Sequence, residues 1–153
     1  MPINKISNKT GHMMFTSVIS RSASAYQRVN VEIGVSTASP HQLVNLLFEA
    51  LLQAVGSARA AIGRGDISTK GKQIGRAVRI LEEGLIPALD LAHGGDLAAN
   101  LKGLYGYCSL RLTEANLRND ETALADVLRV IEPVADGWKQ IGEQVAGGKP
   151  QQH

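Results

Sequence analysis

The stretch LVNLLFEALLQAVGSA at residues 43–58 decides the fold of this chain. Its apolar residues recur at helical spacing, and Glu49 is its only charged residue. An ordinary surface helix carries one apolar stripe slightly more than ~100° wide. Here two stripes together cover roughly 200° of the helix. Such a helix either buries two faces or keeps one face for a partner. The stripes consist of Leu43, Leu47, Ala50, Ala54 and Ala61, and of Val44, Phe48, Leu51, Val55 and Ile62.

The whole chain has the composition of a single globular domain. It has 153 residues, of which 44% are hydrophobic and 20% are charged. The net charge of +2 comes from scattered Lys and Arg, which excludes a nucleic-acid-binding protein. The single cysteine, Cys108, cannot form an intrachain disulfide and fits the reducing cytoplasm. No apolar run reaches ~18 residues, so no membrane insertion is expected.

Helix start and stop signals divide the chain into four helices. Ser39-Pro40-His41-Gln42 has the N-cap, proline and capping-box residues of a helix start. We expect helices over about residues 40–65, 66–94, 96–119 and 120–146. Pro87 should kink the second, and Asp96 should cap the third.

Long helices joined by short turns must run antiparallel to their neighbours. We therefore predict an all-α fold, an antiparallel up-down-up-down four-helix bundle over residues 39–146. Residues 14–38 are rich in Ser and Thr and are predicted to form a flexible N-terminal arm. Residues 1–13 are interpreted as cloning-derived or disordered sequence, and residues 147–153 as a disordered tail.

The residues that usually carry chemistry are few and dispersed. His12, His41, His93 and His153 lack metal-ligand spacing to any other His, Cys or paired carboxylate. Cys108 lies on the core face of the third helix with Leu97, Leu101, Leu104, Leu112 and Ala115, and it is interpreted as a buried structural thiol. We expect no enzyme activity, no catalytic residue, no cofactor and no metal.

The two-striped helix has two interpretations that the pattern does not separate. The first helix of a bundle touches two neighbours, so both stripes could be buried. Alternatively, the second stripe binds a partner through Val44, Phe48, Leu51 and Val55. Two tyrosines on the third helix are weaker candidates, because Tyr105 flanks the core face and Tyr107 points away from it.

Several short blocks resemble the flagellin export chaperones of the FliS family. The opening ASPHQLV at residues 38–44 and the later GGDLA at 94–98 carry most of the likeness. Phe48-Glu49 stands where the family often has Tyr-Asp, and Pro87 is not expected of the family. The likeness spans about residues 25–142 and also includes Tyr26-Gln27, Val29, Leu47-Phe48-Glu49, Ala61-Ile62, Gly65-Asp66, Leu89-Asp90, Asn100-Leu101, Leu104-Tyr105, Tyr107, Arg111-Leu112, Ala115-Asn116, Asn119-Asp120 and Trp138.

This resemblance implies a cytoplasmic chaperone. It would bind the disordered C-terminal segment of flagellin, prevent premature polymerisation and deliver it to the flagellar export apparatus. The resemblance also implies that an N-terminal arm with Tyr26 and Val29 covers part of the site until cargo displaces it. The alternatives are a homodimeric structural or regulatory bundle, and a small helical enzyme or metal protein.

Overall fold

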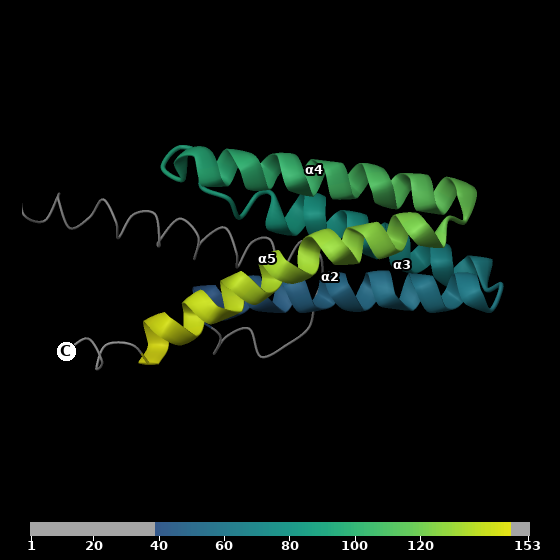
Figure 1. Ribbon diagram of the computed structural model, residues 1–153, viewed down its shortest axis with the longest axis horizontal. Coiled ribbons are helices and arrows are strands. Elements are labelled where there is room, and N and C mark those ends of the chain that lie inside the picture. Colours follow the sequence, from purple (N-terminus) through teal and green to yellow (C-terminus); the bar gives the residue numbers. More distant parts are fainter. Residues whose placement is uncertain (1–38, 148–153) are drawn as a thin grey trace, which may run out of the picture.

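The computed structural model describes residues 39–147 of the chain, and the side chains of residues 39–142. This part is all α-helical and contains no strand. Its elements are α2 (Pro40–Gly63), α3 (Ile67–Arg79), a short π-helix η2 (Ile80–Leu85) that continues α3, α4 (Gly95–Arg118) and α5 (Glu121–Gly147). Figure 1 shows the helices side by side, which confirms the predicted bundle. The arm over 14–38 and residues 1–13 lie outside the described residues, as does the tail after Gly147.

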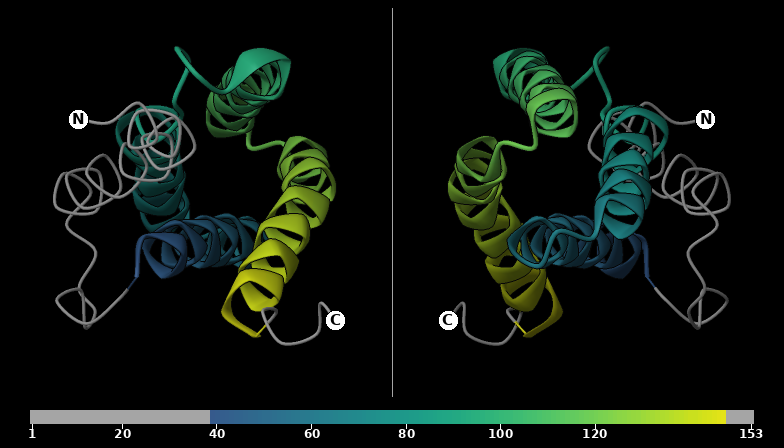
Figure 2. Two further views of the ribbon diagram at one scale, coloured as in Figure 1. Left: turned by 90° about the vertical axis from the view of Figure 1, so that its left-hand side faces the viewer. Right: turned by 90° about the vertical axis from the view of Figure 1, so that its right-hand side faces the viewer.

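The four helices form a closed ring in cross-section. Helix α2 packs against α3 and α5, and α4 packs against the same two helices on the opposite side. The end-on views in Figure 2 show α2 and α4 diagonally across from each other. The first helix therefore has two neighbours, and both of its apolar stripes are largely buried, including Leu47, Leu51 and Val55.

This double burial explains the unusual composition of α2. By length and composition alone, α2 is long and apolar enough to cross a membrane. Core helices of globular bundles meet the same description when two faces are covered. The first of the two interpretations of the stripes thus accounts for most of this helix.

The predicted helix starts on α2, α3 and α5 are confirmed by their capping hydrogen bonds. The Gln42 amide donates to Ser39 Oγ over 3.1 Å, and the Ser39 amide donates to Gln42 Oε1 over 2.7 Å. The Asp66 carboxylate accepts from the Thr69 amide over 3.1 Å and caps α3. Asp120 Oδ1 accepts from the Thr122 amide over 2.9 Å and caps α5.

The predicted course of the second helix is wrong in its last third. Instead of a kinked helix that reaches Gly94, the helix ends at Leu85 and is followed by turns. The Ile86 amide donates a π-type bond to the Leu81 carbonyl over 2.9 Å, and the Ala88 amide still donates to the Gly84 carbonyl over 3.2 Å. Pro87 has no N–H and its ring clashes with a preceding carbonyl, so it ends this helix rather than bending it.

The start of α4 also differs from the prediction. Gly94 is the N-cap residue and Asp96 lies in the first turn, where its charge favours the helix dipole. A Cβ atom on Gly94 would come within 2.6 Å of both Ala98 Cβ and the Asp90 carbonyl oxygen. The chain therefore needs glycine at this position for the close approach of turn and helix.

Helix α5 contains a proline in its interior. Pro133 lies inside the helix and removes one backbone hydrogen bond. Figure 1 shows that α5 changes direction along its length, and its C-terminal half crosses α2. Proline is the usual cause of such a bend.

A buried lysine ties α3 to the end of α4. Lys70 is 5% exposed, and its ammonium donates to the Asn116 carbonyl over 2.9 Å and to Asn119 Oδ1 over 2.6 Å. Asn119 ends α4 with a positive φ of 52°. A cation at a helix C-terminus satisfies free carbonyls and complements the helix dipole. This contact fixes the end of the bundle that lies away from the site described below.

Candidate functional site

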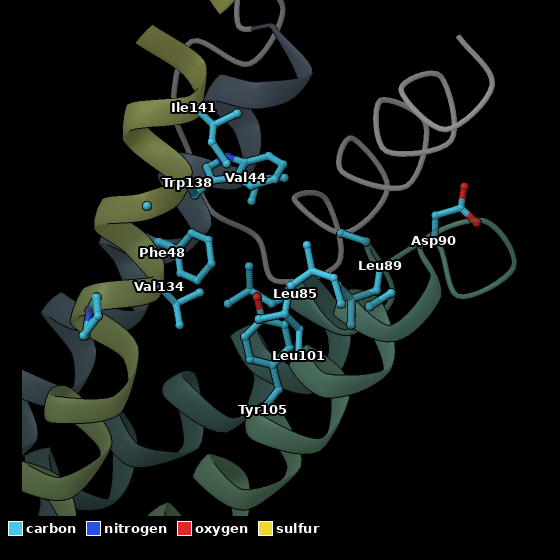
Figure 3. Close-up of a pocket in the computed structure, with 16 residues that line it drawn as sticks. Val44, Phe48, Leu85, Leu89, Asp90, Leu101, Tyr105, Val134, Trp138 and Ile141 are labelled. Carbon is cyan, nitrogen blue, oxygen red and sulfur yellow. The ribbon is translucent and has the colours of Figure 1, made fainter. Parts of the chain in front are cut away.

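A large apolar pocket lies at the end of the bundle where the second helix stops short. Its volume is about 440 Å³, and its walls come from α2, α4, α5 and the turns after η2. Figure 3 shows the lining side chains of α5 and α4 on opposite sides of the pocket. The lining residues are Val44, Phe48, Leu85, Ala88, Leu89, Asp90, Gly94, Leu97, Ala98, Leu101, Tyr105, Pro133, Val134, Gly137, Trp138 and Ile141.

The pocket follows from the early end of the second helix. The helix formed by α3 and η2 ends early. The helices α2, α4 and α5 extend beyond this end, so their apolar faces there have no fourth helix packed against them. Pro87 ends the helix formed by α3 and η2. The side chains of α2, α4 and α5 that its continuation would have covered therefore line an open pocket. A core-like surface without its fourth helix is a suitable site for an apolar ligand.

The floor of the pocket is aromatic. Phe48 from α2 and Tyr105 from α4 are each 2% exposed, and their rings meet edge to face with centroids 6.5 Å apart. Such a pair is favourable beyond the area it buries. Burial raises the pKa of the Tyr105 hydroxyl above its ordinary value of 10.0. This floor therefore stays neutral and suits apolar groups.

The rim of the pocket exposes large apolar side chains to water. Leu97 is 68% exposed and Ile141 is 52% exposed, and they stand on α4 and α5 respectively. Leu89, Leu101 and Val134 are half-buried below the rim. Contiguous exposed apolar surface of this kind marks an interaction site.

The one charged lining residue, Asp90, lies at the edge of the pocket (Figure 3). Its carboxylate accepts from the His93 amide over 3.1 Å, and His93 Nδ1 lies 3.2 Å from Asp90 Oδ2. These contacts hold the turn before α4 in place. Asp90 therefore helps to shape one edge of a mainly apolar pocket.

The structure places the described contact residues in three settings, which are the pocket, the closed core and, for Tyr107, a polar cluster between α4 and α5. Val44, Phe48 and Tyr105 line the pocket. Leu51 and Val55 are fully buried in the closed core and do not line it. The apolar surface that α2 leaves for a partner is therefore confined to its N-terminal half. Tyr26 and Val29 lie outside the described residues.

Tyr107 belongs to a polar cluster between α4 and α5 rather than to the pocket. Its hydroxyl donates to Asp126 Oδ2 over 2.5 Å, and Arg111 Nε donates to the same oxygen over 3.1 Å. Arg129 pairs with the other carboxylate oxygen. The Tyr107 hydrogen bond, above all, lowers the pKa of Asp126 below 3.8. The cluster ties the two helices together.

Sequence reasoning missed several lining residues. Leu97 was assigned to the core face of its helix, and that prediction is wrong, because the missing end of the second helix leaves it exposed. Leu101, Val134 and Ile141 lie on faces that read as ordinary core in the sequence. The sequence feature that indicates their exposure is Pro87, because it ends the second helix, which would otherwise have covered these side chains.

The described residues offer little for catalysis or metal binding. Within residues 39–142 no three His, Cys, Asp or Glu side chains gather closely enough to hold a metal ion. Cys108 is fully buried, as predicted, and burial raises the pKa of its thiol to about 11. A thiol that stays protonated and covered is a poor nucleophile.

Comparisons with known proteins identify close relatives over the whole bundle. Residues 22–145 match the family model described as flagellar protein FliS. The chain is 41% identical over 122 residues to a flagellar secretion chaperone FliS of Salmonella typhimurium, covering 80% of this chain and 90% of that protein. It is 44% identical over 116 residues to a flagellar secretion chaperone FliSB of Pseudomonas aeruginosa, covering 76% of this chain and 91% of that protein. It is also 38% identical over 116 residues to a flagellar secretion chaperone FliS of Escherichia coli, covering 76% of this chain and 85% of that protein.

Proposed function

Since this chain belongs to the FliS family of flagellar proteins, we propose that its pocket binds the disordered C-terminal segment of flagellin. The chain is a flagellar secretion chaperone, and its partner is a flagellar export substrate. It acts in the cytoplasm and without catalysis. It masks the apolar face of flagellin, prevents premature polymerisation and delivers flagellin to the export apparatus. The relatives do not favour the alternative of a homodimeric structural or regulatory bundle.

The observation that carries this proposal is the open apolar pocket of about 440 Å³. A segment that would otherwise self-assemble must bury its apolar side chains in another surface. A groove between helices receives the apolar face of an amphipathic helix at i, i+3, i+4 and i+7. The rim residues Leu97 and Ile141 would contact cargo first, and the floor residues Phe48 and Tyr105 would receive its largest side chains.

A disordered cargo loses conformational entropy when it binds, so the contact surface must be extensive. The pocket is one anchor for such a segment, which would continue along the bundle beyond it. The first step of binding would be displacement of the arm that carries Tyr26 and Val29. Removal of residues 14–38 should therefore tighten cargo binding or speed its association.

The direct test mixes the purified full-length chain with a synthetic peptide of the flagellin C-terminal segment. Isothermal titration calorimetry should give an equimolar complex with a negative heat-capacity change, which marks burial of apolar surface. A peptide of the same composition in scrambled order is the control. If the flagellin peptide does not bind at a concentration of about 100 µM, the proposal is overturned. A chain dimer that persists in light scattering with peptide present would instead support the homodimer.

A further inference from the structure

Trp138, which lines the pocket, stacks on a histidine that lies behind it outside the lining. His41, in the first turn of α2, lies face to face with Trp138 of α5, with ring centroids 4.3 Å apart and planes inclined by 21°. Trp138 Nε1 also donates a hydrogen bond to the His41 carbonyl over 3.1 Å. Figure 3 shows Trp138 beside Val44 at one edge of the pocket. The position of this indole therefore depends on His41.

The His41 ring fits between the helices because α5 has glycine opposite it. A Cβ atom on Gly142 would lie within 2.4 Å of the His41 ring, so any side chain there would displace the imidazole. The Pro133 bend directs this half of α5 across α2. Together these features hold the imidazole against the indole.

We propose that the neutral imidazole of His41 is a positioning group that holds Trp138 in the pocket wall, and that protonation of His41 releases Trp138 and weakens cargo binding. The part about cargo rests on the function proposed above. The part about the stack concerns this chain alone.

Two features of the site oppose a charged ring. His41 Nε2 is buried and has no hydrogen-bond partner among the side chains of residues 39–142, so a proton there would meet no acceptor in that part of the chain. The ring also lies in the first turn of α2, at the positive end of the helix dipole. A protonated imidazole gains some cation–π attraction from the indole. An unsatisfied charged N–H at a helix N-terminus outweighs that gain.

Among the side chains that the structure describes, no charged group near the stack compensates for a positive ring. Helix α2 has no charged side chain before Glu49, two turns further on. On α5 the charged residues near Trp138 whose side chains the structure describes are Asp136 and Lys139, both exposed to water, and Glu143, which follows Gly142, lies beyond the described side chains. Burial lowers the pKa of His41 below its ordinary value of 6.5. A group with a lowered pKa destabilises the stacked state as the pH falls through and below that ordinary value.

Trp138 is the only tryptophan of the chain, so its fluorescence reports directly on the stack. The full-length protein without cargo is titrated from about pH 8 to about pH 5, and the emission of Trp138 should change with a midpoint below 6.5. His41→Phe keeps an aromatic partner that cannot titrate, so its emission should not change with pH. His93→Asn removes the other described histidine, which lies outside the stack, and should behave as wild type. A His41→Phe profile identical to the wild-type profile would overturn the proposal.

A second variant tests the stack without removing the histidine. Gly142→Ala places a methyl group where the imidazole lies, so at about pH 8 its emission should resemble that of wild type at low pH. Gly106→Ala on α4, with open space around its Cβ, controls for the gain in helix propensity. Unchanged emission of Gly142→Ala at about pH 8 would contradict the role of His41 in holding the indole.

The same variants are then compared for affinity to the flagellin peptide. Wild type should bind several-fold more weakly at about pH 5.5 than at about pH 8, and by less than about tenfold because the pKa of His41 lies below 6.5, whereas His41→Phe should show almost no change. If no variant binds the peptide at any pH, the proposed cargo is wrong, whereas the fluorescence titration still decides the stack. If wild type and His41→Phe weaken equally, His41 does not act on the pocket.

Discussion

Leu97 offers the sharpest prediction about the pocket, because it lies at the rim and is 68% exposed. Full burial of a leucine side chain contributes about 1.5–3 kcal/mol. Cargo that covers the exposed two thirds would gain about 1–2 kcal/mol from this residue, and Leu97→Ala removes most of that gain. We expect the Kd for the flagellin peptide to rise about five- to tenfold, since 1.4 kcal/mol corresponds to a factor of ten.

The matched control is Leu117→Ala. Leu117 lies on the same helix and is 77% exposed, but it is not part of the pocket. Both variants should retain the wild-type melting curve by circular dichroism, because neither side chain packs in the core. Fluorescence anisotropy of a labelled peptide gives the affinities. A Leu97→Ala variant within twofold of wild type, or an equal loss for Leu117→Ala, would refute the placement of cargo in this pocket.

Three further predictions concern the framework around the site. Lys70→Met should lose about 2 kcal/mol of unfolding free energy in urea, since it removes two charge-assisted hydrogen bonds, whereas the exposed Lys72→Met should stay within about 0.5 kcal/mol. The lowered pKa of Asp126 stabilises the fold above pH 3.8, and this stability is lost below it; Tyr107→Phe should flatten that acid dependence of the melting temperature. Gly94→Ala should destabilise the turn by about 1–3 kcal/mol and weaken peptide binding, and calorimetric melting that matches wild type would contradict the close contact.

Much of the bundle could be predicted from the sequence because its signals are local. Ser39, Asp66 and Asp120 each bond to backbone amides two or three residues ahead, so their identity alone indicates a helix start. The apolar spacing likewise predicted most core positions, such as Ile74, Leu112 and Leu124. These features need no knowledge of how the helices pack.

The pocket could not be predicted in the same way, because it depends on where the second helix ends relative to the other three helices in the folded bundle. The periodicity of Leu81, Leu85 and Leu89 favoured a continuous helix, but Pro87 ended it, and the turn changed the surroundings of Leu97. Apolar residues that would have been core became the rim of a pocket.

The expected apolar contact surface of α2 therefore coincides only in part with the pocket. The second stripe of α2 suggested an open face through Leu51 and Val55, yet α2 has a neighbour on each side and buries both residues. Periodicity records how much apolar surface a helix has, but not which neighbour covers it. Only Val44 and Phe48 of that stripe reach the pocket.

Site-specific photo-crosslinking tests the central claim most directly. A benzoylphenylalanine residue replaces Leu97 or Val134 on opposite walls of the pocket, or Leu117 as the control, and each full-length variant is irradiated with intact flagellin. Crosslinks from the positions of Leu97 and Val134 to the flagellin C-terminal segment, with none from that of Leu117, are the expected result. Crosslinks from the position of Leu117 alone would contradict the account.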